Sequence, residues 1–343
     1  MSRVVVLGLD NLSVGEFEAI CTLGWTLNGN PAVFGGGSTT ITIPDDVAVQ
    51  PWLNFGRMVV VQPEDLPAYI GMIDTPWKAT SPAALTIYDV EYLLNLRAPD
   101  APVKLTGSVD RIFSQVIDLA NSLEDLYLLI GNVYEIDRTS REEALDSRSL
   151  WDQVQALALR ARTEFVFRPE RGEGNRWYVH VDLAREMGTD TGFLLSDGEN
   201  ANMRVTGATV RGEIVNRMVG INSASTSQSR LTTSPLLDAV SVETYRLRNR
   251  VVQSRDVTDL NTLIRNTQNA LDASSRPYLE LTVDVMNNNH AWLQLRPGNR
   301  VLTHASKIRL PGGVSGWRGS TRITKMALQE ATNTVTMTLT GAL

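Results

Sequence analysis

The order of predicted elements in the C-terminal part of the chain limits its possible folds more than any other feature. A strand at 206–219 with no evident partner precedes a Ser/Thr-rich loop, a strand at 240–248 and a helix at 256–272. A strand at 278–286, a Pro-Gly turn within 295–301 and two closing strands follow. This order predicts a β-module that is interrupted by one amphipathic helix.

Short β-branched segments dominate the first 103 residues. The clearest predicted strands are 39–43 and 58–62, and further strands follow at 68–74 and 84–89. Asn-Gly and Gly-rich sequences supply turns between these strands. Several short strands at this spacing predict a β-barrel or a β-sandwich.

The hydrophobic period changes to a helical one from Lys104 onward. Ser108 is expected to cap one helix, and Ser149 with Asp152 predicts the start of a second. A strand, a Gly-rich turn and another strand follow over 164–182. Helices followed by a hairpin predict a small α+β domain.

The chain then returns to β-type patterning after one more helix. Asp256 is expected to cap that helix, and Pro277 follows its end. Residues 334–340 alternate with period two, as in a half-buried strand. The Ser/Thr-rich loop at 223–234 is expected to be exposed.

Length and composition are those of a globular protein. A chain of 343 residues has room for two or three domains. Its 43% hydrophobic and 20% charged residues argue against disorder. The net charge of −6 disfavours a duplex-binding protein, because phosphates attract basic surfaces, but it is compatible with a channel along which DNA slides.

The cysteine content and the hydropathy exclude several classes of site. Cys21 stands alone, which excludes an intrachain disulfide and a Cys-based zinc site, and it is expected to be a small buried residue. The first ten residues contain too short an apolar run for a secretory signal. No stretch approaches about 20 apolar residues, so no membrane span is predicted and synthesis in a cytoplasm is expected.

Motifs for metals, cofactors and nucleophiles are not found. His180, His290 and His304 lack the spacing that directs two imidazoles at one metal. Residues 4–10 lack the glycines of a dinucleotide fold, and 34–38 lacks the Lys of a P-loop and is interpreted as a hairpin turn. The sequence therefore predicts no catalytic, cofactor-binding or metal-binding residue and no cofactor.

Two carboxylate pairs leave a glycosidase open as an alternative. Glu135 with Asp137, and Asp197 with Glu199, supply the residue type that such an enzyme needs on both sides of a cleft. Separation across a cleft cannot be read from sequence. A solvated strand and a polar turn are the simpler interpretations.

An Arg-aromatic cluster is a candidate for single-stranded nucleic acid, because bases stack on aromatic rings beside cations. Its members are Arg168, Arg171, Arg176 and Trp177. Glu164, Glu170 and Glu173 cancel much of this charge. An exposed hairpin of mixed charge is the simpler interpretation.

Four short sequence segments, in this order along the chain, resemble those of a known family. They are Gly-Met-Ile-Asp at 71–74, the segment 150–158 leading into Phe-Val-Phe at 165–167, the segment 213–219, and 295–301. Taken together, the whole chain resembles the phage baseplate-hub or tail-tip family, the N-terminal part of tail-associated proteins.

The resemblance implies an α+β, mainly β fold with two tube-like β-barrel modules. The first would be 1–103, and the second 206–250 with 277–343. A peripheral α+β domain would occupy 104–205, and a helical insertion 251–276. Two equivalent modules per chain would let a trimer match a six-fold tail.

The resemblance further implies a non-enzymatic structural hub in the virion, at the tail tip or baseplate. A homotrimer would close the DNA channel until ejection, without sequence-specific binding of the DNA that passes through its lumen. Its partners would be a distal tail protein or tail tube ring, a tape-measure protein, and a fibre, spike or central tip protein.

Two alternative functions remain open beside that of a structural hub. They are a tail-tip peptidoglycan hydrolase and a carbohydrate-binding adhesion module. Many family members carry a long C-terminal extension, whereas this sequence ends three residues after Thr340. A bare hub is therefore expected, with wall cleavage or host recognition in another chain. Injection systems and gene-transfer particles use similar hubs.

Overall fold

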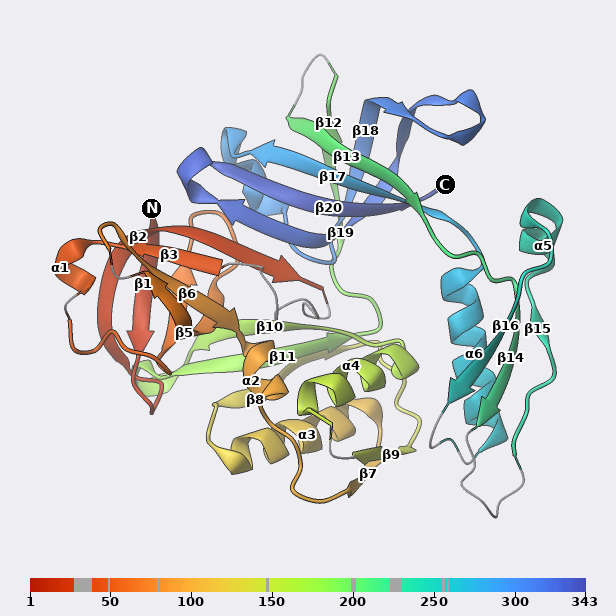
Figure 1. The fold of residues 1–343 in the computed structure, drawn as a ribbon, viewed down its shortest axis with the longest axis horizontal. Helices are drawn as coiled ribbons and strands as arrows, with labels where there is room; N and C mark the ends of the chain where they lie inside the picture. Colours follow the sequence, from red (N-terminus) through yellow and green to blue (C-terminus); the bar gives the residue numbers. More distant parts are fainter. Residues whose placement is uncertain are drawn as a thin grey trace. The chain divides into compact units, whose positions relative to one another are not determined.

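The chain divides into two compact units (Figure 1). The larger unit comprises Met1–Gly207 and Leu281–Leu339, and the smaller comprises Ala208–Glu280 and Thr340–Leu343. The computed structural model describes residues 1–27, 39–48, 50–78, 80–145, 148–198, 202–222, 230–254, 257 and 259–343. Strands outnumber helices along these ranges, which confirms the expected α+β, mainly β fold class.

Six strands in the first part of the chain close into a barrel. They are β1 (Ser2–Leu7), β2 (Ser13–Thr26), β3 (Thr39–Ile43), β4 (Met58–Gln62), β5 (Tyr69–Lys78) and β6 (Ala83–Asp89). Their order is β1-β4-β5-β6-β3-β2, and pairing of β2 with β1 closes the ring. Side chains of β3 alternate between buried and half-buried, because one face of the strand lines the barrel core. The strands predicted at 39–43 and 58–62 are confirmed.

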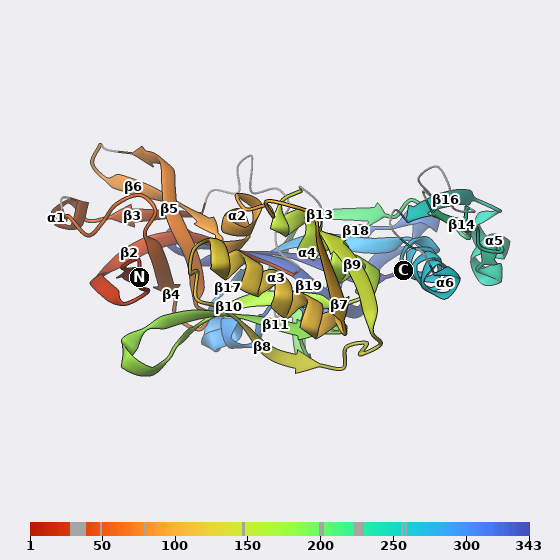
Figure 2. The same cartoon turned by 90° about the horizontal axis from the view of Figure 1, so that it is seen from below.

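The short helix α1 (Asp45–Ala48) lies between β3 and β4 of the barrel segment. Helices and small sheets follow the barrel. They are α2 (Val90–Asn95), β7 (Val103–Gly107), α3 (Val109–Leu123), β8 (Leu128–Tyr134), β9 (Arg141–Leu145), α4 (Leu150–Ala161), β10 (Glu164–Arg171) and β11 (Trp177–Ala184). The sheet order is β10-β11-β8, and β7 pairs with β9. Helices α3 and α4 lie against this sheet (Figure 1 and Figure 2).

Both helix starts are where the sequence predicts them. The Ser149 hydroxyl accepts a hydrogen bond of 3.2 Å from the Asp152 amide at the start of α4. Ser108 is the N-cap residue of α3, although its side chain makes no capping hydrogen bond. The hairpin predicted at 164–182 is formed by β10 and β11.

One apolar core joins this α+β segment to the barrel. It includes Phe113 of α3, Trp151 of α4 and Phe165 of β10, together with Val5 and Val60 of the barrel. The rings of Phe113 and Phe165 lie 5.9 Å apart. Burying each such side chain contributes about 1.5–3 kcal/mol. The segment therefore belongs to the same compact unit as the barrel.

A second group of six strands extends the barrel sheet. It comprises β12 (Asp190–Ser196), β13 (Met203–Arg211), β17 (Tyr278–Met286), β18 (Arg300–Arg309), β19 (Ser315–Gln329) and β20 (Thr334–Ala342). The junction is antiparallel pairing of β19 with β2, with Leu328 opposite Leu23. Beyond it lie β20, β17 and β13 in order, while β18 pairs with both β19 and β12. The strands predicted at 278–286 and 334–340 are confirmed.

The smaller unit contains a three-stranded sheet and a helix. Strand β14 (Arg217–Asn222) lies between β15 (Leu236–Leu237) and β16 (Asn249–Ser254). Helix α6 (Leu260–Ser274) packs on β14, and α5 (Ala239–Tyr245) precedes β16. The apolar core includes Val215, Met218 and Leu271.

Several element predictions in this part of the chain are wrong. Residues 240–248 were expected to form a strand, but Asp238 accepts a hydrogen bond of 3.0 Å from the Ser241 amide and starts α5 instead. The strand expected at 206–219 is two strands, β13 and β14, separated at Gly212, whose φ of +123° few other residues adopt.

The helix expected at 256–272 starts later, because Asp259 caps α6 through a bond of 2.7 Å from the Thr262 amide. Asp256, most of the loop at 223–234 and the segment 34–38 lie outside the described residues. The residues expected to form a second module, 206–250 and 277–343, are divided between the two compact units.

Candidate functional site

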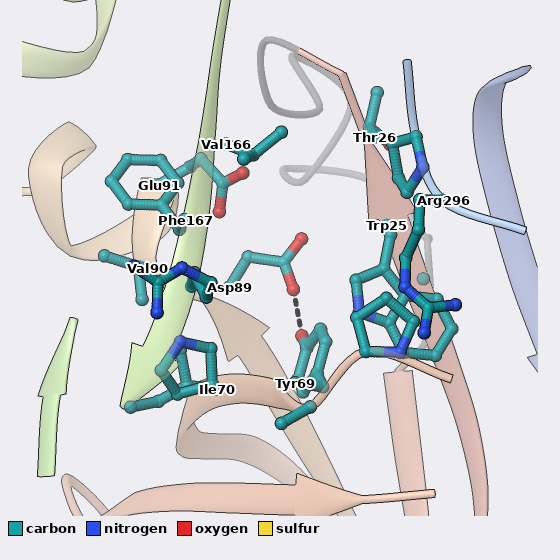
Figure 3. Close-up of a pocket in the computed structure, with 16 residues that line it drawn as sticks. Trp25, Thr26, Tyr69, Ile70, Asp89, Val90, Glu91, Val166, Phe167 and Arg296 are labelled. Atoms are coloured by element: carbon teal, nitrogen blue, oxygen red, sulfur yellow. Dashed lines mark hydrogen bonds between the residues drawn. The ribbon is translucent and has the colours of Figure 1, made fainter. Parts of the chain in front are cut away.

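A cavity of about 420 Å³ lies in the larger unit (Figure 3). The end of β2, the start of β5, the turn from β6 into α2, and β10 all contribute to its lining. Arg296 and Pro297, which follow the 3₁₀ helix Asn288–Gln294, complete it. Five segments that are separated in the sequence therefore form this cavity.

Two carboxyl groups face the cavity from the turn between β6 and α2. Asp89 is the last residue of β6 and the N-cap residue of α2, and Glu91 lies in the first turn of α2. The Asp89 carboxylate accepts a hydrogen bond from the Tyr69 hydroxyl. Figure 3 shows both carboxyl groups on one side of the cavity, with Trp25 and Arg296 on the other.

Burial raises the pKa of both carboxyl groups, because an apolar environment disfavours the charged form. The pKa of Asp89 rises to about 6, although the Tyr69 hydrogen bond opposes the rise. The pKa of Glu91 lies well above its ordinary value, first because of burial and then because of the nearby Asp89 charge. Burial, with the Asp89 charge and hydrogen bond, also raises the pKa of Tyr69. Burial therefore favours the neutral form of all three groups, and the pKa of Asp89 is about 6.

These residues were not identified from the sequence. Residues 84–89 were interpreted only as a strand, and the Asp-Val-Glu at 89–91 matches no motif. The available signal was two acidic residues at the boundary between an alternating strand and an apolar helix. Such a boundary places charged side chains beside a core.

The three histidines lie in different parts of the structure. His180 is in β11, with Nε2 3.7 Å from Glu170 Oε2. His304 is in β18. His290 Nδ1 lies 2.7 Å from Asp65 Oδ2, and this hydrogen bond raises the pKa of His290. Among the residues that the structure describes, no three His, Cys, Asp or Glu side chains are grouped to hold a metal ion.

In the described parts of the two carboxylate pairs considered for a glycosidase, the aspartates accept hydrogen bonds from backbone amides. Glu135 follows the end of β8 with a φ of +50°, and Asp137 Oδ1 accepts a hydrogen bond of 2.9 Å from the Thr139 amide. Asp197 Oδ1 accepts a bond of 2.7 Å from the Ser306 amide, whereas Glu199 lies outside the described residues. Glu135 and Asp137 therefore belong to a turn and not to a solvated strand.

The Arg-aromatic cluster does not form an open stacking surface. Trp177 is 5% exposed, so its ring is not available to a nucleobase. Arg168 is held by Asp182 at 2.9 Å and by Glu170 at 2.5 Å. Arg176 lies over the Tyr127 ring, 5.1 Å from its centre. The hairpin is therefore of mixed charge, as expected, but its tryptophan belongs to the core.

Cys21 is buried in β2, which confirms the expected small core residue. Burial raises the pKa of its thiol to about 12. A thiol with that pKa is a poor nucleophile at neutral pH. In the described parts of the chain, no helix has the length and hydropathy needed to cross a bilayer.

Comparison with known proteins relates the fold to phage tails. No family model matches the sequence, and no curated protein is similar to it in sequence. A 43 kDa tail protein of prophage MuSo2 from Shewanella oneidensis is similar in structure, with a TM-score of 0.58, 11% identity, and coverage of 99% of this chain and 98% of that chain.

Two further tail proteins show the same likeness. Prophage tail protein gp18 from Listeria monocytogenes has a TM-score of 0.58, 12% identity and coverage of 99% and 94%. A tail protein from Neisseria meningitidis has a TM-score of 0.55, 13% identity and coverage of 99% and 96%. Over nearly its whole length, the chain has the fold of phage tail proteins.

Proposed function

We propose that the chain is a structural hub of a phage tail tip or baseplate, located in the virion. The observation that carries this proposal is the likeness in fold to three tail proteins, which covers 99% of the chain in each case. A likeness that extends over the whole chain concerns the arrangement of all its parts and not one common domain.

The proposed assembly is a homotrimer that adapts a six-fold tail tube to a three-fold tip. Each chain has a closed group of six strands, β1–β6, and a second group, β12, β13 and β17–β20. Pairing of β2 with β19 joins the two groups in one sheet. Three chains would present six such groups, so each chain could contact two subunits of a hexameric ring. In this proposal the two modules of each chain are therefore these two strand groups, β1–β6 and β12, β13 with β17–β20.

The proposed partners are a distal tail protein or tail tube ring, a tape-measure protein, and a fibre, spike or central tip protein. The trimer would close the DNA channel until ejection. A net charge of −6 supports passage of DNA without retention, because phosphate groups bind basic surfaces.

Light scattering on the purified chain, followed by negative-stain imaging, tests the assembly. The expected particle has three times the 37.8 kDa chain mass and averages to a three-fold ring with six lobes. Monomers at every concentration, including after mixing with the tube protein of the same particle, would contradict the trimer. Peptidoglycan zymography on the same sample tests the hydrolase alternative, which predicts a cleared band.

A further inference from the structure

The carboxyl groups in the cavity lack a cation among the described residues. Glu91 is 9% exposed and faces the cavity, and its own backbone amide is the only hydrogen-bonding group that acts on its carboxylate in the described parts of the chain. Among the residues that the structure describes, the Asp89 carboxylate has one hydrogen-bond partner, the Tyr69 hydroxyl. A buried and a half-buried acid at one cavity, without a counter-ion among the described residues, are costly when ionised.

The two arginines that line the cavity are bound by other groups. Arg168 pairs with Asp182 and Glu170, as described above. Arg296 Nη1 donates to three backbone carbonyl groups, those of Asp65 at 3.3 Å, Trp292 at 3.1 Å and Leu295 at 2.6 Å. Neither guanidinium contributes to the pKa of Asp89 or Glu91. The acidic side of the cavity is therefore not neutralised by these arginines.

The opposite wall carries an unused hydrogen-bond donor. The indole Nε1 of Trp25 is buried and has no partner in the described structure. Aromatic rings of Trp25, Tyr69 and Phe167 all line the cavity. Aromatic faces attract cations, and a buried N–H group needs an acceptor. The cavity thus offers sites for a cation and for a carbonyl oxygen in the same ligand.

We propose that this cavity binds a lysine or arginine side chain carried by a peptide segment of another polypeptide. The ammonium or guanidinium group would lie between Asp89 and Glu91, and a carbonyl oxygen of the peptide would accept from Trp25 Nε1. A volume of about 420 Å³ is within the range of small-ligand pockets. The inference does not depend on the trimer, because each chain contains the whole cavity.

Binding of a cation should release protons. Burial raises the pKa values of Asp89 and Glu91, and that of Asp89 is about 6, so part of the Asp89 population is neutral at that pH. An adjacent positive charge favours the ionised carboxylates and lowers both pKa values. The peptide should therefore bind more tightly at pH 8 than at pH 5.

Nuclear magnetic resonance of the tryptophan side chains tests the proposal on the full chain. The probes are the capped tripeptides Gly-Arg-Gly and Gly-Lys-Gly, the neutral analogue Gly-citrulline-Gly, and spermidine. The Trp25 indole N–H signal, assigned by Trp25→Phe, reports on the site. The variants are Glu91→Gln and Asp89→Asn, with Glu173→Gln on the exposed hairpin turn as the matched control.

The expected result is a shift of the Trp25 signal with Gly-Arg-Gly or Gly-Lys-Gly that the citrulline peptide does not reproduce. Removal of one charge-assisted contact in Glu91→Gln should weaken binding by about tenfold or more, while Glu173→Gln should bind normally. Equal binding of the citrulline peptide, unchanged affinity in Glu91→Gln, or no binding at millimolar peptide would overturn the proposal. Binding of spermidine without binding of either cationic peptide would contradict the proposal that the cation belongs to a polypeptide.

Discussion

The two compact units build their cores in different ways. In the larger unit, aromatic and aliphatic side chains such as Phe113, Trp151 and Phe165 pack between the helices and the barrel. In the smaller unit, the apolar core centres on Val215, Met218 and Leu271. Polar side chains complete the interior of the smaller unit, and they are Asn216, Asn222, Thr233, Ser241, Thr267 and Ser275.

The polar interior of the smaller unit is connected by hydrogen bonds. Asn216 Nδ2 donates to the Arg246 carbonyl oxygen at 2.8 Å, and its Oδ1 accepts from the Arg248 amide at 2.7 Å. The Ser241 hydroxyl donates to the Ser275 carbonyl oxygen. Apolar packing depends on volume, whereas these bonds depend on the position of each atom. The smaller unit should therefore tolerate few changes of its polar residues.

Phe113→Ala should have the largest effect and should act on the larger unit. Phe113 is 1% exposed, and its removal leaves a cavity between α3 and β10. We expect a loss of about 3–5 kcal/mol in the free energy of unfolding. Hydrogen exchange should increase in α3 and the barrel. Leu159→Ala, at a position that is 78% exposed, is the control, and an equal loss there would contradict the core assignment.

Asn216→Ala should destabilise the smaller unit selectively. The change removes the side-chain partner of the Arg248 amide and of the Arg246 carbonyl group, both of which are in partly buried hydrogen bonds. We expect a loss of about 2–3 kcal/mol, because each buried polar group without a partner is costly. Exchange should rise in α6 and not in α3. The exposed Asn249→Ala serves as the control, and matching losses would show that the network is unimportant.

Gly220→Ala tests the packing of α6 on β14. A Cβ atom at Gly220 would lie 2.0 Å from Thr267 Oγ1, so either the Thr267 side chain or the helix must shift. We expect a loss of about 1–3 kcal/mol, as for other overpacked interiors. Gly207→Ala is the comparison, because its nearest neighbour would be an ordinary contact at 3.5 Å. Thermal unfolding of both variants measures the difference, and a neutral Gly220→Ala would show that α6 moves easily.

Glu91→Gln should have the smallest effect and should stabilise the larger unit in a pH-dependent way. The folded state holds the Glu91 proton more tightly than the unfolded state, so the wild-type chain loses stability as the pH rises above the unfolded pKa of about 4.5. Glutamine cannot ionise and avoids this loss. The variant should melt higher than wild type at pH 8, with a smaller difference at pH 4. A difference that does not change with pH would contradict the burial of Glu91.

Local signals allowed much of the fold to be predicted. β-branched composition identified β3 and β4, and alternation identified β20. Ser149 with Asp152 identified the start of α4, because these patterns depend on neighbours in sequence. The second half was predicted less well. Residues 240–248 have strand-like composition, but capping by Asp238 and the strand register around β14 favour a helix followed by β16.

The cavity could not be predicted, because its residues come together only in the folded chain. Trp25, Glu91 and Arg296 are far apart in sequence and belong to no common motif. The raised pKa of Glu91 depends on burial, which sequence does not give for a charged residue. The histidines and the described members of the carboxylate pairs, Glu135, Asp137 and Asp197, were visible in sequence but do not line this cavity.

Hydrophobic period and capping are local, so the sequence was enough to predict the β-rich class, a barrel or sandwich in the first part, the main strands, two helices of the α+β segment and the resemblance to tail proteins. The structure was needed to show that the predicted strands form a closed barrel and not a sandwich, that β2 pairs with β19, and that Asp89 and Glu91 line one cavity. Those features depend on contacts between distant segments, whose geometry is set by packing and not by neighbouring residues.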